Sequence, residues 1–218
     1  MPGTSAEDYL KAIFKLGHEQ QPVTTKNISD HLGVRMASVT GMVKQLAGKG
    51  YVEHQPYYGV RLTESGKREA LRMLRRHRLI ELFLVKTLDL GWDEVDEDAE
   101  KLEHAISDRL IERIAAYLGH PQFDPHGSPI PSPDGKIGTV SGVTLDQLDV
   151  GSAGDVVNVS DEDPEFLRYL TGLAVKIGSR VRVVDRAPFA GPISIQVARK
   201  NVTIGVEAAK RIMVSRVP

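Results

Sequence analysis

Apolar residues recur at helical spacing through the first part of the chain, and two short β-type runs follow them. The predicted elements are three helices and two strands, at residues 6–16, 26–32, 36–47, 51–55 and 59–63. Ser5 can cap the first helix, and Gly33 ends the second after a short turn. Three helices followed by a hairpin are typical of a winged helix-turn-helix.

The third helix opens with short polar side chains, which favours contact with DNA over a bare three-helix core. Short hydroxyls suit phosphate oxygens, and arginine or lysine can meet either the backbone or a base edge. The candidate DNA contacts are Arg35, Ser38, Thr40, Lys44 and Arg61.

A long helix is predicted over 67–88, and after Gly91-Trp92 an acidic helix is predicted to continue to Leu118. In this second helix an apolar stripe runs through Leu102, Ile106, Leu110 and Ile114. The two helices carry more apolar surface than one small fold needs. We interpret the excess as a homodimer interface, which a two-fold DNA site would require.

Glu100, Glu103 and His104 stand at i, i+3 and i+4, so a helix places them on one face. His77 and Glu81 repeat the i, i+4 spacing one predicted helix earlier. Such acids are most often a solvated helix face. Held half-buried together, however, they repel one another unless a cation lies between them.

Residues 119–138 are rich in proline and glycine and are expected to form a connector, with His120 and His126 as loop residues rather than ligands. The pattern then changes to five short β runs, with a helix at 165–173 after Asp163-Pro164. Five strands in so short a stretch predict a small barrel. The fold class is therefore mainly α with a β C-terminal domain, divided at 1–66, 67–138 and 139–218.

The amino-acid composition limits which metal ligands and which partners are possible. The 218 residues include no cysteine, so a metal must be held by carboxylate, imidazole, carbonyl or water. No run is long and apolar enough for a membrane span or a signal peptide, which predicts a cytoplasmic protein without a membrane partner. Residues 1–72 are mildly basic and 89–103 strongly acidic, as expected for an anionic partner at one end and a cation at the other.

Five stretches together resemble the diphtheria-toxin-repressor family of metal-dependent transcriptional repressors. They are residues 7–13 (EDYLKAI), 76–81 (RHRLIE), 103–108 (EHAISD), 126–131 (HGSPIP) and 177–181 (IGSRV). The resemblance implies a winged-helix domain, a helical dimerisation domain and a C-terminal SH3-like barrel, in this order. It also implies two metal sites, one with Asp8, Glu100, Glu103 and His104, the other with His77, Glu81 and Asp96, to which the barrel adds Glu162 and Glu165.

Asp8 and Glu100 offer oxygen where the iron-sensing branch has sulfur ligands, so the resemblance favours Mn²⁺, with Fe²⁺ as the alternative. The expected function is a metal-dependent regulator, a repressor of metal-uptake genes, that binds double-stranded operator DNA with an inverted repeat. No small-molecule substrate is expected. Two other classes remain open at this point: a di-metal hydrolase or oxidase, and a winged-helix regulator whose acids are purely structural.

Overall fold

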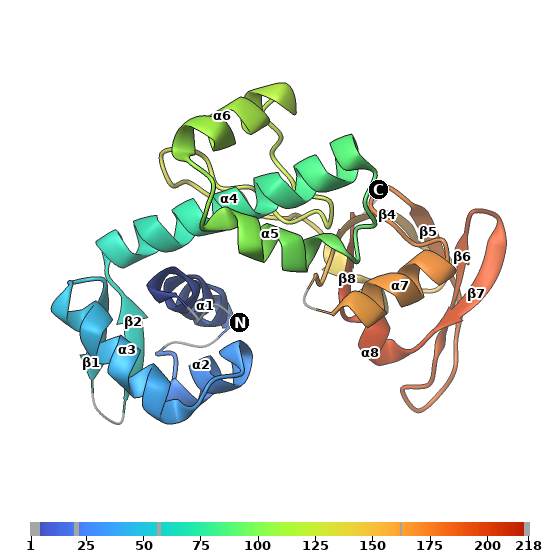
Figure 1. The fold of residues 1–218 in the computed structure, drawn as a ribbon. Coiled ribbons are helices and arrows are strands. Elements are labelled where there is room, and N and C mark those ends of the chain that lie inside the picture. The colour runs from blue at the N-terminus through green and yellow to red at the C-terminus, as the bar shows by residue number, and fades with distance from the viewer. Residues whose placement is uncertain (1–4, 20–21, 56–57, 162, 216–218) are drawn as a thin grey trace. The chain divides into compact units, whose positions relative to one another are not determined.

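The structure is a computed structural model that describes residues 5–19, 22–55, 58–161 and 163–215. The chain forms two compact units, one of residues 1–76 with 131–137 and the other of 77–130 with 138–218. Figure 1 shows the helices and strands along the chain. The first unit has one hydrophobic core, and the second has one among its helices and another in its sheet. No helix in the described ranges is long and apolar enough to cross a membrane.

The first unit contains the predicted three helices and hairpin. They are α1 (Ala6–Glu19), α2 (Thr25–Leu32), α3 (Met36–Gly48), β1 (Val52–Gln55) and β2 (Gly59–Leu62). The Thr24 side chain accepts from Asn27 N and caps α2, and Gly33 ends this helix with a φ of 62°. β1 and β2 pair antiparallel, and Val23 adds an isolated bridge to Val60. This arrangement is a winged helix-turn-helix.

Apolar side chains spaced three or four residues apart turn inward from each helix of this unit. Ile13 of α1, Ile28 of α2 and Val43 of α3 are at most 2% exposed, and Val60 of the hairpin completes the core. The exposed face of α3 carries Ser38, Lys44 and Gln45 together with Met36.

The second unit begins within α4 (Glu64–Leu88) and continues with α5 (Val95–Glu103) and α6 (Asp108–Tyr117). The prediction of one acidic helix to Leu118 is wrong, because the chain leaves the helix at His104 and starts a new one at Asp108. Ser107 makes the break by capping α6, accepting from Leu110 N at 3.3 Å. The predicted apolar stripe is broken with it, and Leu102 and Leu110 are 44% and 51% exposed.

Two arginines of α4, Arg75 and Arg78, donate hydrogen bonds to the proline-rich connector at residues 119–138. Arg75 Nη1 donates to the carbonyl of Pro131 at 2.9 Å, within the first unit. Arg78 Nη1 donates to the carbonyl of Pro129 at 2.6 Å, within the second. Guanidinium donors thus satisfy two proline carbonyls of the connector. Backbone hydrogen bonds, such as that from Ile130 N to the carbonyl of Gln122 at 2.8 Å, hold it as well.

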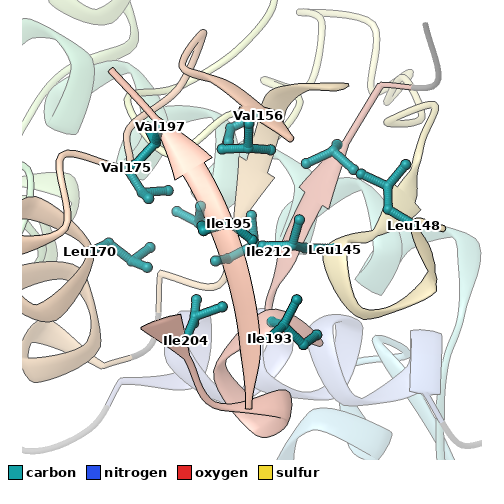
Figure 2. Packing of buried hydrophobic residues seen from close by; sticks show 14 of the residues in the cluster. Leu145, Leu148, Val156, Leu170, Val175, Ile193, Ile195, Val197, Ile204 and Ile212 are labelled. Atoms are coloured by element: carbon teal, nitrogen blue, oxygen red, sulfur yellow. The ribbon is translucent and has the colours of Figure 1, made fainter. Parts of the chain in front are cut away.

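The C-terminal part is one six-stranded antiparallel sheet with the order β3-β8-β4-β5-β6-β7. Its elements are β3 (Val143–Thr144), η1 (Leu145–Gln147), β4 (Ala153–Val159), α7 (Pro164–Gly172), β5 (Arg180–Arg186), β6 (Ile193–Val197), β7 (Lys200–Ile204), α8 (Val206–Ala209) and β8 (Ile212–Val214). Five strands match the predicted runs, and β3 was not predicted. Alternate residues of these strands, such as Ile193, Ile195 and Val197, meet in one core that Leu170 of α7 also enters (Figure 2).

Two side-chain contacts tie this sheet domain to the helices of the same unit. Trp92, in the turn before α5, donates its indole N–H to Thr171 Oγ1 of α7 at 2.9 Å. Asp93 Oδ2 lies 3.5 Å from Arg168 Nη1, also on α7. The turn that precedes the acidic helix is therefore held by the sheet domain.

Candidate metal centre

The acidic helix α5 brings together the residues that the sequence singled out. Glu100, Glu103 and His104 each offer a ligand atom, and these atoms lie within 4.8 Å of one another. Glu103 is fully buried, whereas His104 is the C-cap of the helix and is partly exposed. Because the ionised carboxylates of Glu100 and Glu103 repel each other, a positive charge between them would be stabilising.

His77 of α4 lies against these acids from the neighbouring helix. Its Nδ1 is 2.7 Å from Glu103 Oε2, and its Nε2 is 3.3 Å from Asp96 Oδ1 and 3.5 Å from Glu81 Oε1. Burial alone would lower the pKa of this imidazole. Hydrogen bonds to Asp96, Glu103 and Glu81 outweigh that effect and raise the pKa well above its usual value. The acids around His77 thus favour the protonated form of its imidazole.

A third group of ligand atoms involves residues that the sequence interpretation had assigned to a loop. Glu81, Asp124 and His126 are 1%, 5% and 1% exposed, and one ligand atom of each lies within 4.8 Å of the others. Glu81 Oε2, Asp124 Oδ2 and His126 Nδ1 have no hydrogen-bond partner among the described residues. Buried polar atoms left unpaired in this way are rare.

The loop that supplies this group holds both of its ligands in fixed orientations. Asp124 Oδ1 accepts from the backbone N–H of His126 at 2.8 Å and of Ser128 at 2.9 Å, while Oδ2 lies 3.3 Å from Arg78 Nε. His126 Nε2 lies 2.8 Å from the carbonyl of Trp92, which can only accept, so Nε2 carries the hydrogen. Nδ1, on the other side of the ring, faces Glu81 Oε1 at 3.8 Å. This donor set fits a divalent cation.

Electrostatics at Asp124 support the same interpretation. Burial, followed by the charge of Glu81, raises the pKa of Asp124 to about 6, although Arg78 opposes this with its Nε 3.3 Å from Asp124 Oδ2. The charge of Asp161, between β4 and α7, raises this pKa further. The charges of Arg78 and His126 lower this pKa, but they do not offset burial and the neighbouring carboxylates.

The remaining predicted ligands are Asp8, Glu165 and Glu162. Asp8 is buried on α1, in the first unit. Glu165 is exposed at the start of α7, where Asp163 Oδ1 accepts from its backbone N–H, and it belongs to none of the three groups in the described ranges. Glu162 lies outside the described residues.

The predicted DNA contacts lie on or beside α3 and on the hairpin. Arg35 is the N-cap residue of α3, and it is exposed like Ser38, Lys44 and Arg61. Thr40 is only half-exposed, and its hydroxyl donates to the carbonyl of Met36 at 3.0 Å. That bond leaves its oxygen as an acceptor, which suits phosphate less well than the sequence suggested.

Asp124 and His126 were missed because their partner Glu81 stands more than 40 residues earlier in the chain. No periodic pattern links a loop to a helix at that separation. The available signal was the run Asp124-Pro125-His126-Gly127, a turn with an aspartate positioned to accept from the backbone two residues later.

Three family models match the chain. They are the iron-dependent repressor N-terminal DNA-binding domain at residues 1–60, the iron-dependent repressor metal-binding and dimerisation domain at 63–132, and the FeoA domain at 143–216. The last of these covers the antiparallel sheet domain, which is SH3-like. The matched regions follow one another in the order in which the structure places the winged helix, the acidic helices and the sheet.

Individual proteins give the same result. An HTH-type transcriptional regulator of Methanocaldococcus jannaschii is 40% identical over 115 residues, 52% of this chain and 92% of that protein. The iron-dependent repressor IdeR of Mycobacterium leprae is 29% identical over 98% of this chain and 97% of its own length. A solved manganese-dependent transcriptional repressor in complex with manganese is 43% identical, covers 98% of this chain and 100% of its own, and superposes with a TM-score of 0.89. With the winged helix, the acidic helices and the sheet domain all matched in order, the chain belongs to the diphtheria-toxin-repressor family of metal-dependent transcriptional repressors.

Proposed function

We propose that this chain is a metal-activated transcriptional repressor that binds operator DNA as a homodimer. The observation that carries the proposal is the buried group of Glu81, Asp124 and His126, whose inward atoms lack hydrogen-bond partners among the described residues. Two buried carboxylates with one guanidinium beside them are costly, and a divalent cation supplies further positive charge. The family consists of transcriptional repressors, so we propose no di-metal hydrolase or oxidase activity.

Two sets of residues would hold the metal. One consists of Glu81, Asp124 and His126, with Asp161 as a neighbouring acid; the other consists of Asp8, Glu100, Glu103 and His104. The set that the resemblance implied, His77, Glu81 and Asp96, also has ligand atoms within 4.8 Å of one another, and it shares Glu81 with the first set. Oxygen donors with one imidazole suit Mn²⁺ and, second, Fe²⁺, the metals named in the relatives' titles. We also propose that Glu162 and Glu165 add ligands to the set of His77, Glu81 and Asp96.

The second set suggests how metal controls DNA binding. Asp8 belongs to the unit that carries α3, whereas Glu100, Glu103 and His104 belong to the other unit. A cation shared by them would tie the winged helix to the dimerisation helices. Fixing the two recognition helices of a dimer at one spacing favours an inverted-repeat operator. Such an ion must bind the DNA-competent arrangement more tightly than the other one.

The dimer interface is proposed on the apolar surface of the acidic helices. Leu102, Leu110 and Tyr117 are 44%, 51% and 70% exposed, and all three lie within the matched dimerisation region. A patch of large apolar side chains on a monomer indicates a partner surface. Because the repressor acts on operator DNA, we place it in the cytoplasm.

The test compares two matched substitutions on α5. Glu100→Gln removes a charge from the second set, and Glu97→Gln removes one from an exposed acid a turn earlier that belongs to no group in the described ranges. We expect Mn²⁺ to increase operator affinity in the wild type and in Glu97→Gln but at most weakly in Glu100→Gln, measured by fluorescence anisotropy. Full operator binding by the wild type in chelator would refute the proposal.

A further inference from the structure

The strand β4 contains an irregularity opposite the loop that supplies His126. Val156 pairs with Val214 of β8, but Asn158 pairs with Met213, so the register shifts between them. The alternation of buried and partly exposed residues fails at the same place, where Val157 and Asn158 are both half-buried. A β-bulge redirects side chains in this way and is frequent beside functional sites.

The redirected side chain binds the ligand loop directly. Asn158 Nδ2 donates to the carbonyl of His126 at 3.2 Å and lies 3.1 Å from Ser128 Oγ. The backbone N–H of Val159 donates to the same His126 carbonyl at 3.0 Å. The peptide of His126 is therefore held by two donors from a strand of the sheet domain.

The loop approaches β4 closely enough to exclude a side chain. Gly127 has a φ of 83°, and a Cβ atom there would lie 2.0 Å from the carbonyl oxygen of Val157. Only glycine combines this backbone conformation with so short a distance. The contact between loop and strand is thus a precise one rather than a loose packing of side chains.

The contacts with β4 fix the backbone of His126, and Trp92 fixes its imidazole ring. The imidazole stacks on the Trp92 indole with ring centroids 5.8 Å apart, and its Nε2–H points to the Trp92 carbonyl. With the backbone held by β4 and the ring by Trp92, Nδ1 is fixed toward Glu81. Metal ligands must be held to within about 0.5 Å of their productive position.

We propose that Asn158 is a positioning residue for the metal ligand His126, and that the sheet domain thereby completes the site of Glu81, Asp124 and His126. This inference rests on the proposed function, because it requires a metal at that site. Residues that orient a ligand in this way commonly change metal affinity about 10- to 100-fold when replaced.

The experiment uses the full chain and Mn²⁺ alone. Trp92 is the only tryptophan in the sequence, so quenching of its fluorescence reports on the ion beside His126, and electron paramagnetic resonance counts all bound ions. We expect Asn158→Leu, which keeps the number and branching of the side-chain heavy atoms and removes the donor, to weaken the Trp92-reported binding about 10- to 100-fold. Binding at the α5 acids should be unchanged. The matched control is Asn201→Leu, on the exposed part of β7.

A purely structural role for Asn158 predicts a different result. In that case the thermal midpoint in chelator falls while the Trp92-reported affinity of the folded protein stays at the wild-type value, and the inference is overturned. Gly127→Ala provides an independent test, since displacing the loop from β4 should cause the same loss of affinity. Quenching that is absent in the wild type, or equal in His126→Ala, overturns the proposed site itself and the inference with it.

Discussion

The ion pair between Arg78 and Asp124 makes a quantitative prediction about the metal-free protein. Asp124 is fully buried, and its pKa of about 6 lies roughly two units above the value of 3.8 in an unfolded chain. Keeping this carboxylate ionised at pH 7.5 therefore costs about 3 kcal/mol of folding free energy, at about 1.4 kcal/mol per unit. This loss of folding free energy increases between about pH 4 and pH 6, the two pKa values of Asp124, and stays constant above pH 6.

Arg78→Met removes the cation that opposes this rise. The pKa of Asp124 then increases further, and at pH 7.5 the carboxyl takes up a proton. Protonation limits the total cost to about 5 kcal/mol, so the additional loss is about 2 kcal/mol at pH 7.5 and under about 0.5 kcal/mol at pH 6. The lost hydrogen bond to Pro129 adds roughly 1 kcal/mol at either pH.

Thermal unfolding in chelator measures the difference. At roughly 2–4 °C per kcal/mol, the variant should melt about 6–12 °C lower at pH 7.5 and about 3–6 °C lower at pH 6. Arg72→Met is the control, because the Arg72–Glu69 pair on the same helix is exposed and should contribute under about 1 kcal/mol. An equal loss at both pH values would refute the argument, since the Asp124 proton would then play no part.

Two further predictions concern DNA and protons. Arg35→Ala should weaken operator binding by about 1–3 kcal/mol at one base position if Arg35 reads a base, or uniformly with a shallower salt dependence if it contacts phosphate; unchanged affinity at every salt concentration would remove this part of α3 from the interface. Because hydrogen bonds to Asp96, Glu103 and Glu81 raise the pKa of His77, a cation that binds beside this imidazole competes with its proton, so Mn²⁺ affinity should rise with pH. Calorimetry in two buffers of different ionisation enthalpy counts the protons released, and a count of zero would contradict the assignment.

Local signals in the sequence predicted the winged helix and most of the sheet domain. Thr24 and Gly33 mark the ends of α2, and alternating apolar residues mark strands such as β6. The break between α5 and α6 was missed because the apolar spacing from Leu102 to Ile114 continues through it without a glycine or proline. Ser107 was the available cap signal, and the helical periodicity obscured it.

Part of the candidate site was equally predictable. Glu100, Glu103 and His104 lie within one turn, so helical spacing alone brings them together. The meeting of His126 with Glu81 depends on the connector being held by Arg78 and β4, and such long-range contacts leave no periodic trace in the sequence. Predicting them would have required the tertiary fold.

The interruption between α5 and α6 has an electrostatic consequence for the acids of α5. A helix that stops at Glu103 places the negative end of its backbone dipole, roughly half an elementary charge, next to Glu103 and His104. In an unbroken helix through Leu118 that partial charge would lie some four turns away, and the peptide groups near His104 would be fully paired with one another. By ending here, the backbone itself makes this corner of the molecule attractive to a cation, in addition to the carboxylates that its side chains provide.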